Sequence, residues 1–392
     1  MKYGFPILPA TLMAAAAVFV TACKESDPKP PATEEGSRTL LVYAIASNNL
    51  YHNFQTDSIE MLDGVRNIDY DGMNLVLYWV TPKGDAVLKR IDKVDKENVA
   101  FTELKRYDRK TYSTDPKRIS EVIADVKRLC PADGYDMVMC SHGTGWTPTF
   151  KNHGVSKVSP ARVMQHSFGA DKYDGYTDEI DIDELAAAIP DHSFGYIWFD
   201  ACYMSGIEVI YQLRNKSDYF VGYPTEVWSD GMSYDKMLRH MLKKEPDLRA
   251  AAEEFFNSYN EYGNPVTIVV TDNSRIEPFA DACREVFSAT SDYAIDERSL
   301  QNYSRSPHGP FYELKDYFYA KAYPLNLDPA IFEKALADFV VTAHCSTYDF
   351  MGHTIDKNFY TGLSCHAYDP QDDGKEENYY RKLDWFGRVY SK

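Results

Sequence analysis

A histidine and a cysteine near the ends of two hydrophobic runs could together perform nucleophilic catalysis. His142 lies at the end of "YDMVMCSHG" (135–143), and Cys202 follows "FGYIWFDA" (194–201). A thiol attacks well only as the thiolate, which a neighbouring imidazole helps to form. The pair therefore predicts thiol chemistry, provided that the fold brings the two side chains together. The alternative is a buried core thiol and a structural histidine.

Backbone groups beside this pair could stabilise the negative charge that develops during acyl transfer. Gly143 leaves room for a substrate backbone next to His142. A helix predicted to start directly after Cys202 would add a positive dipole end and free N–H groups. We therefore expect the N–H groups of Gly143 and Cys202 to form an oxyanion hole.

The elements that must position these residues alternate between strands and helices from Thr39 onward. Short apolar runs predict buried strands at 39–47, 73–81, 135–143, 194–201, 218–227 and 265–272, with an edge strand at 99–107. Periodic apolar residues predict helices at 54–68, 115–130, 181–189, 203–214, 248–262, 275–294, 311–323 and 328–344. Strands that are apolar on both faces indicate a mainly parallel sheet covered by helices on both sides. Functional residues gather past the carboxyl ends of such strands.

Several local signals refine this assignment. Asp115 is expected to cap the helix at 115–130, and Asp183 is a plausible cap for the helix at 181–189. Pro278 is expected to break the helix at 275–294 early, and 360–370 is expected to form a late strand. No linker clearly separates two folding units, although the chain could divide near 240–265.

Two segments give the sequence a family resemblance. "HGTGW" (142–146) followed by "FDACYMSGIEVIYQL" (199–213) resembles the clostripain family of cysteine peptidases, which shares a caspase-like fold with gingipains, legumains and caspases. Further similar stretches are "LLVYAIASNNL" (40–50), "YFVGY" (219–223), "GMSYDKML" (231–238), "FYELKDYF" (311–318), "YTGLSCHAYDP" (360–370) and "YRKLDWF" (380–386). The resemblance thus covers most of residues 39–392. It implies a caspase-like α/β/α sandwich, with a core at about 39–240 and a C-terminal α/β extension.

The resemblance also implies a role for individual residues. Cys202 matches the nucleophile, His142 the catalytic histidine, and Gly143 the glycine that follows it. Asp200 matches the acidic residue that selects Arg or Lys before the scissile bond. Residues i and i+2 of a strand point to one side, so Asp200 and Cys202 can face one cleft. The alternative is that Asp200 caps the next helix. Tyr223 and Pro224 depart from the family pattern, which puts the preference for basic residues in question.

The segment between the two catalytic residues carries two further hypotheses. Zymogens of the family are often cleaved there, which makes four basic residues candidates for self-processing: Lys151, Lys157, Arg162 and Lys172. The acidic stretch 173–184 could bind calcium, as in some relatives, or could be an ordinary solvated charge run. It lacks the spacing of an EF-hand loop, and we expect no other metal and no organic cofactor.

The N-terminus predicts export and lipid attachment. Residues 11–20 form an apolar stretch too short to span a bilayer, and "VTAC" (20–23) resembles a bacterial lipoprotein box. Residues 1–22 would then be a signal peptide, Cys23 the lipidated residue, and 23–38 a flexible tether. We expect an extracytoplasmic, lipid-anchored protein of the bacterial cell envelope, at the outer membrane or cell surface. The alternative is a plain secretory signal with a chance cysteine.

Overall charge limits the partners. The formal net charge of −17 argues against nucleic acid and is compatible with a cationic substrate. The sequence therefore favours an endopeptidase that acts on proteins or peptides after Arg or Lys. Two rival functions stay open at this point: a catalytically inactive surface lipoprotein that binds peptide or glycan, and an acyl transferase that uses the same dyad.

Overall fold

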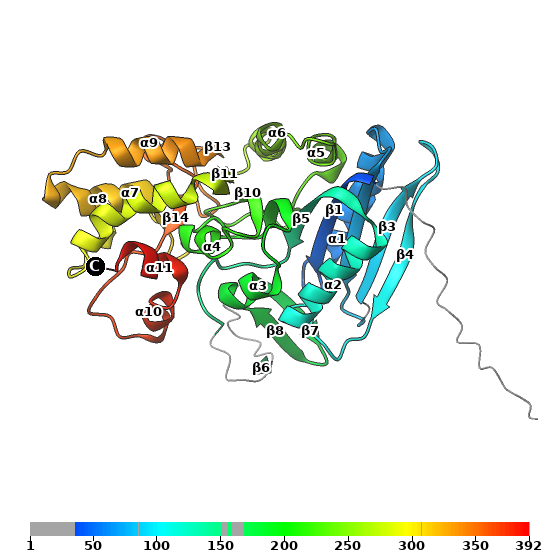
Figure 1. Ribbon diagram of the computed structural model, residues 1–392, viewed down its shortest axis with the longest axis horizontal. Helices are drawn as coiled ribbons and strands as arrows, with labels where there is room; N and C mark the ends of the chain where they lie inside the picture. Colours follow the sequence, from blue (N-terminus) through cyan, green and yellow to red (C-terminus); the bar gives the residue numbers. More distant parts are fainter. Residues whose placement is uncertain (1–35, 85, 150–155, 158–167, 307, 392) are drawn as a thin grey trace, which may run out of the picture. The chain divides into compact units, whose positions relative to one another are not determined.

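The computed structural model describes residues 36–391, apart from 85, 150–155, 158–167 and 307. Residues Thr33–Lys392 form one compact unit. Within the described residues, a nine-stranded sheet has the order β13-β11-β10-β9-β5-β1-β2-β3-β4 (Figure 1). Its strands are β1 (Gly36–Ile45), β2 (Met73–Val80), β3 (Ala86–Lys93), β4 (Val99–Tyr107), β5 (Ala132–Cys140), β9 (Phe194–Asp200), β10 (Ser217–Gly222), β11 (Thr267–Asp272) and β13 (Val340–Cys345).

The centre of this sheet is parallel and its two flanks are antiparallel. β1 pairs in parallel with β2 and β5, and β9 pairs in parallel with β5 and β10. β3 and β4 extend one side, and β11 and β13 the other, by antiparallel pairing. The predicted edge strand at 99–107 is confirmed as β4. The parallel centre is the part that matters for the site, because its carboxyl ends lie side by side.

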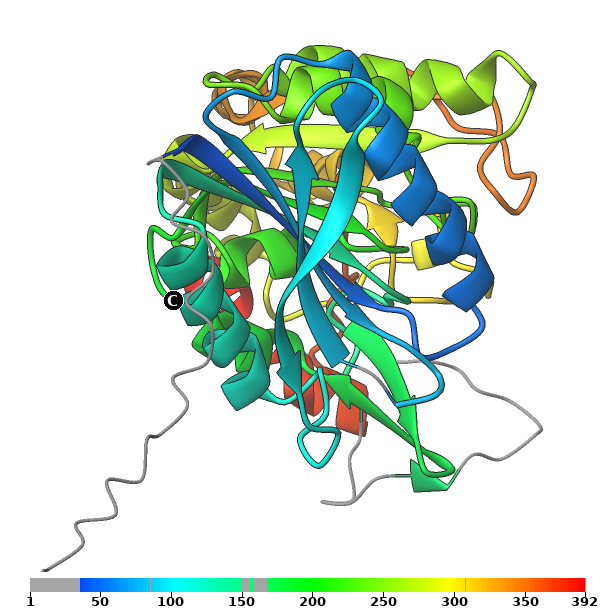
Figure 2. The same ribbon diagram turned by 90° about the vertical axis from the view of Figure 1, so that its right-hand side faces the viewer.

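Helices cover both faces of the sheet, as the apolar strands predicted. One face carries α1 (Tyr51–Asn67), α5 (Tyr234–Met241) and α6 (Leu248–Asn260), which enclose one core cluster. The other face carries α2 (Pro116–Leu129), α3 (Ile182–Ala188), α4 (Ile207–Gln212), α7 (Ile276–Ala289), α8 (Leu314–Ala322), α9 (Ala330–Phe339) and α11 (Asp384–Val389). Figure 2 shows α1, in blue, and α2, in teal, on opposite sides of the central strands. This mixed α/β sandwich with a mainly parallel central sheet is the predicted caspase-like architecture.

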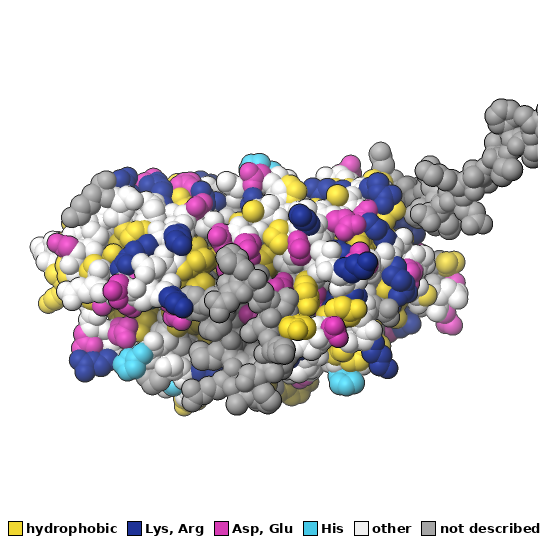
Figure 3. All heavy atoms as spheres, turned by 90° about the horizontal axis from the view of Figure 1, so that it is seen from below, with side chains coloured by type: hydrophobic (Ala, Val, Ile, Leu, Met, Phe, Trp, Pro, Cys, Tyr) yellow, Lys and Arg dark blue, Asp and Glu magenta, His cyan; other side chains and the backbone are white. Residues whose placement is uncertain are grey.

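Smaller elements complete the unit. A three-stranded sheet pairs β6 (Ser156–Lys157), β8 (Tyr176–Ile180) and β7 (Phe168–Tyr173), and β12 (Tyr312–Glu313) pairs with β14 (Ser364–Cys365). The remaining helices are α10 (Lys375–Tyr380) and the 3₁₀ turns η1 (Asn273–Arg275), η2 (Glu297–Ser299) and η3 (Tyr323–Leu325). Among the described residues on the face drawn in Figure 3, acidic and basic side chains are interspersed.

Four local predictions are wrong for identifiable reasons. Asp181, not Asp183, caps α3, because it forms a capping box with Glu184. Pro278 does not break α7, because it lies in the first turn, where no i−4 hydrogen bond is lost. The predicted helix at 328–344 ends at Phe339, and its β-branched continuation pairs with β11 as β13. Within 360–370, only β14 is a strand, and β3 was not predicted.

Candidate active site

The pairing register of two parallel strands places the backbones of His142 and Cys202 at the same end of adjacent strands. Cys140, the last residue of β5, pairs with Asp200, the last residue of β9. Just beyond, the Ser141 N–H donates to the Asp200 carbonyl at 3.4 Å. His142 and Cys202 therefore both stand two residues past paired positions, at the same end of neighbouring strands. The predicted position of each residue at a strand end is therefore confirmed.

Gly143 allows the two backbones to approach closely. A β-carbon at this position would lie 2.7 Å from the Cys202 carbonyl oxygen and 3.1 Å from the β-carbon of Ala201. Any side chain would force the histidine and cysteine segments apart. Among the hydrogen bonds of the described residues, the N–H groups of Gly143 and Cys202 donate to no acceptor. Both are thus available as the predicted oxyanion donors.

The nucleophile turn differs from its predicted form. The helix that follows Cys202 starts only at Ile207, because Gly206 is its N-cap and Ala201–Ser205 form a turn. Tyr203 within that turn has φ 60°, a left-handed conformation that is costly for a bulky residue. Its hydroxyl donates to Glu226 at 2.9 Å, and its ring stacks on Phe311 at 4.5 Å. The C-terminal extension therefore helps to hold the strained turn that presents the thiol.

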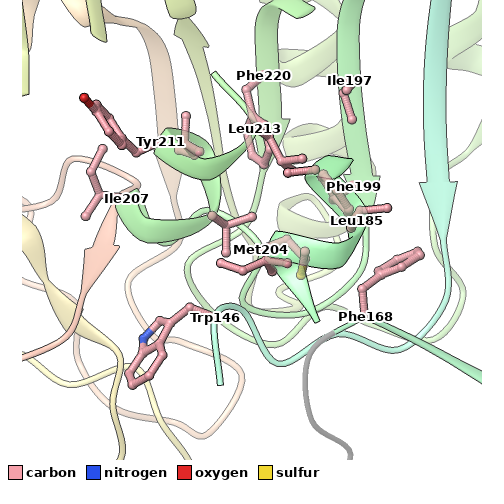
Figure 4. Close-up of a cluster of buried hydrophobic side chains, with 14 of the residues drawn as sticks. Trp146, Phe168, Leu185, Ile197, Phe199, Met204, Ile207, Tyr211, Leu213 and Phe220 are labelled. Carbon is pink, nitrogen blue, oxygen red and sulfur yellow. The ribbon is translucent and has the colours of Figure 1, made fainter. Parts of the chain in front are cut away.

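The core beneath this turn is fully buried. Met204 is 0% exposed and packs in the cluster that also holds Trp146 and Phe168. Figure 4 shows Met204 between these two aromatic side chains in that view. Trp146 comes from the "HGTGW" segment, so the segments that carry His142 and Cys202 pack into the same hydrophobic core.

The thiol of Cys202 is half-buried and contacts the wall formed by Val227. The Val227 N–H donates to Sγ at 3.4 Å, and Sγ lies 3.9 Å from the Val227 carbonyl oxygen. Burial raises the pKa of Cys202 to about 12, with a further increase from the Glu226 carboxylate. Within the described residues, no hydrogen bond joins Sγ to His142. The thiol is therefore protonated at neutral pH in this state.

The imidazole of His142 is neutral as well. Burial lowers the pKa of His142 to about 4, and the positive charge of Lys172 lowers it further. Nε2 lies 2.9 Å from Oδ1 of Asn49, which follows β1. A carbonyl oxygen can only accept, so this bond places the hydrogen on Nε2 and leaves the lone pair on Nδ1. Nδ1 can then serve as a general base for the thiol.

Asp200 is buried, and its carboxyl group has no hydrogen-bond partner at normal hydrogen-bonding geometry among the described residues. It is 5% exposed, and neither carboxylate oxygen accepts a hydrogen bond within the described residues. Burial raises the pKa of Asp200 to about 7, although the nearby Cys140 thiol and Met232 N–H lower it in part. It does not cap α4, whose N-cap is Gly206. A buried carboxyl group without a counter-charge is costly, which is unusual for a purely structural residue.

A second buried carboxyl group from α1 lies close to Asp200. Asp57 is 3% exposed and makes no ion pair within the described part of the chain. Burial raises the pKa of Asp57 to about 9, and the Asp200 carboxylate adds the next largest increase. The two groups therefore interact electrostatically at the base of the site.

The basic residues of the intervening segment have different surroundings. Lys172 lies inside β7, paired with Thr177 of β8, and Lys157 lies in β6, paired with Tyr176. Lys151 and Arg162 lie outside the described residues, as do Cys23 and the whole predicted signal peptide and most of the tether. Among described residues, no helix is long and apolar enough to cross a membrane.

The acidic stretch 173–184 is built into the fold. Asp178 accepts a hydrogen bond from Thr114, and Asp181 accepts one from the Thr149 N–H at 2.8 Å. Within the described residues, no three His, Cys, Asp or Glu side chains converge as metal ligands would. These carboxylates have protein partners instead.

No sequence motif had predicted a role for Asn49, Asp57 or Val227. Asn49 follows the carboxyl end of β1, which neighbours β5, so the same strand-end argument applies to it. Asp57 shares a helix stripe with Phe54 and Met61, and an acid on an apolar stripe is itself a signal. Val227 acts through its backbone, and no side-chain pattern reveals that.

A thiol, an imidazole and free N–H groups at adjacent parallel strand ends, on a caspase-like sandwich, define a cysteine peptidase. The family model "Clostripain family" matches residues 42–384. The chain belongs to the clostripain family of cysteine proteases.

Solved structures of the same kind are similar over most of the chain. A secreted C11 cysteine protease from Bacteroides thetaiotaomicron, in complex with an irreversible peptide inhibitor, is 25% identical, with a TM-score of 0.75 over 90% of this chain and 99% of that chain. An inactive zymogen C11 protease from Parabacteroides distasonis is 24% identical, with a TM-score of 0.77 over 92% and 100%. A structure of a secreted C11 cysteine protease from B. thetaiotaomicron called iotapain is 23% identical, with a TM-score of 0.74 over 91% and 100%. No curated protein sequence matches the chain.

Proposed function

We propose that this protein is an endopeptidase that cleaves after Arg or Lys through a Cys202–His142 dyad. The observation that carries the proposal is the Cys140–Asp200 register, which sets both residues at one strand edge. A buried carboxyl group without a protein cation, Asp200, stands at the same edge. Such a group favours a guest with a positively charged side chain.

The resting dyad is a neutral thiol and a neutral imidazole, so catalysis begins with general-base transfer. Nδ1 of His142 takes the Cys202 proton while Sγ bonds to the substrate carbonyl carbon. The N–H groups of Gly143 and Cys202 stabilise the resulting oxyanion. As the intermediate collapses, the imidazolium gives its proton to the leaving amine and a thioester remains. Water then attacks the thioester, with its proton passing through His142 to the thiol, and the acid is released. These steps need no cofactor.

Peptide turnover with thiol mapping tests the function. We expect hydrolysis of fluorogenic peptides ending in Arg or Lys, none of matched Ala or Glu peptides, and a basic chloromethylketone attached to Cys202. A binding lipoprotein would retain peptide without turnover. An acyl transferase would give product only when an amine acceptor is supplied. Labelling at another cysteine would contradict the proposed nucleophile.

We further propose self-activation by cleavage in the segment between the dyad residues. One similar structure is described as an inactive zymogen. Among the four candidate residues, Lys157 and Lys172 are both held in ladders with β8, which disfavours cleavage there in the folded state. Lys151 and Arg162 are then the preferred sites.

Chain patterns of wild type and Cys202→Ala test self-cleavage. We expect the wild-type protein to yield a second N-terminus within 152–163, and Cys202→Ala to stay a single chain. Incubation of Cys202→Ala with active wild-type enzyme distinguishes cleavage within one molecule from cleavage between molecules. Identical patterns for the two proteins would show that processing does not depend on the dyad.

We propose that the mature protein is extracytoplasmic and anchored through a lipid on Cys23. The apolar stretch 11–20 followed by "VTAC" supports this, and two similar proteases are described as secreted.

A further inference from the structure

Two buried carboxyl groups from different elements converge at Gly231. A β-carbon placed on this glycine would lie 2.9 Å from Oδ2 of Asp200 and 3.7 Å from Oδ2 of Asp57. Gly231 has φ +64°, and its carbonyl accepts the Tyr259 hydroxyl at 2.5 Å, so the loop is held in this position. Because the residue has no side chain, its backbone can lie against both carboxyl groups.

No positive charge in the described residues compensates this pair. The charged groups facing Asp57 are Glu60 of α1, Asp200 of β9 and Asp230 of the loop between β10 and α5. All three are acidic. The other titratable groups that interact electrostatically with the pair are neutral at physiological pH: Cys140 of β5, Cys202, Tyr223, Tyr234 of α5 and Tyr259 of α6. Two like-charged buried groups raise each other's cost, which either a proton on the carboxyl group or an external cation would offset.

We propose that Asp57 is the second carboxylate that receives the basic side chain of the substrate, together with Asp200. This inference rests on the proposed cleavage after Arg or Lys. A guanidinium carries five donors in a planar fork and can reach two carboxylates at once, whereas an ammonium is a compact point charge. The two-carboxylate pocket therefore favours Arg over Lys, and Asp57 contributes more to Arg recognition.

The pair also predicts how substrate affinity depends on pH. Burial raises the pKa of Asp57 to about 9 and that of Asp200 to about 7, so both lose protons between neutral and alkaline pH. Only the ionised carboxylates attract the cation, so KM for an Arg peptide should fall as the pH rises from about 6 to 9. The dyad does not titrate in this range, because the pKa is about 4 for His142 and about 12 for Cys202. The change should therefore appear in KM and not in kcat.

Steady-state kinetics of Asp57→Asn test the inference. We expect KM for an Arg peptide at pH 8.5 to rise roughly ten- to a hundredfold, since a hydrogen bond to a charged group is lost. The Lys peptide should lose less, and the fall of KM toward pH 9 should disappear. Both kcat and the rate of Cys202 alkylation by a small uncharged reagent, iodoacetamide, should stay within about twofold. Asp63→Asn, an exposed carboxylate on the same helix, is the matched control and should match wild type.

The outcomes separate this inference from the function on which it rests. If wild type cleaves after basic residues and Asp57→Asn has the same KM and pH profile, the role of Asp57 is wrong and the proposed function stands. If Asp57→Asn loses alkylation and kcat as well, Asp57 is structural and the inference also fails. If wild type prefers uncharged residues, both are wrong.

A binding measurement keeps the test independent of the folding of that variant. Arginine-peptide binding to Cys202→Ala at pH 7.5 should release about one proton, because the cation drives ionisation of the pair. Calorimetry in two buffers with different ionisation enthalpies measures this release. Binding without proton release would overturn the inference.

Discussion

Replacing Cys202 with alanine should abolish hydrolysis of Arg and Lys peptides while leaving the fold intact. The thiol is half-buried, and its hydrogen-bonding contacts are with the Val227 backbone, so its removal leaves only a small void. Without the sulfur no thioester can form, and kcat should fall by roughly 10⁴-fold or more. Initial rates at equal concentrations of folded protein, checked by thermal melting, measure the loss.

Cys345→Ala is the matched control for this experiment. Cys345 is also a free, half-buried thiol, and burial raises its pKa to about 11. It lies on β13, at the edge of the sheet and away from the β5–β9 strand ends. Its removal should leave turnover and inhibitor labelling unchanged. Activity that survives in Cys202→Ala but is lost in Cys345→Ala would place the nucleophile elsewhere.

Replacing Asp200 with asparagine should remove most of the preference for basic residues. The carboxylate is buried, and the loss of one partner from a buried ion pair costs several kcal/mol. We expect kcat/KM for Arg and Lys peptides to fall by roughly a hundred- to a thousandfold. Alkylation of Cys202 by the uncharged iodoacetamide should be unchanged, since the sulfur contacts Val227. Asp218→Asn, an exposed carboxylate on β10, should behave as wild type.

The same substitution should stabilise the free protein at alkaline pH. Burial raises the pKa of Asp200 from 3.8 to about 7, so the folded state favours the protonated acid. Its stabilising contribution is fully present below about pH 4 and is lost as the pH rises through about 7. Asp200→Asn should therefore melt at a higher temperature than wild type at pH 8, and the difference should shrink toward pH 4. A lower melting temperature at pH 8 would show that Asp200 has a structural partner.

Much of the fold could be predicted because its signals are local. Six predicted buried strands correspond to β1, β2, β5, β9, β10 and β11, and Asp115 caps α2 as expected. Predictions from local sequence were wrong where contacts between residues far apart in the chain determine the structure. The sequence at Val340–Cys345 continues a helical pattern of apolar residues. It forms strand β13 instead, because its backbone hydrogen-bonds to β11. The turn after Cys202 stays non-helical, because Tyr203 is bound by Glu226 and Phe311, which are distant in sequence.

The amino-acid sequence was sufficient to select His142, Gly143, Asp200 and Cys202, because strand ends and the short motifs around them are local features of the chain. Tertiary structure alone determined the protonation states of these residues and which side chains lie next to them. Asn49 binds His142 only because β1 lies beside β5, and Asp57 meets Asp200 only because α1 packs against the loop at Gly231. The pKa of a buried group depends on desolvation and on neighbours from other elements. Those quantities arise only when the chain is packed, so no local pattern encodes them.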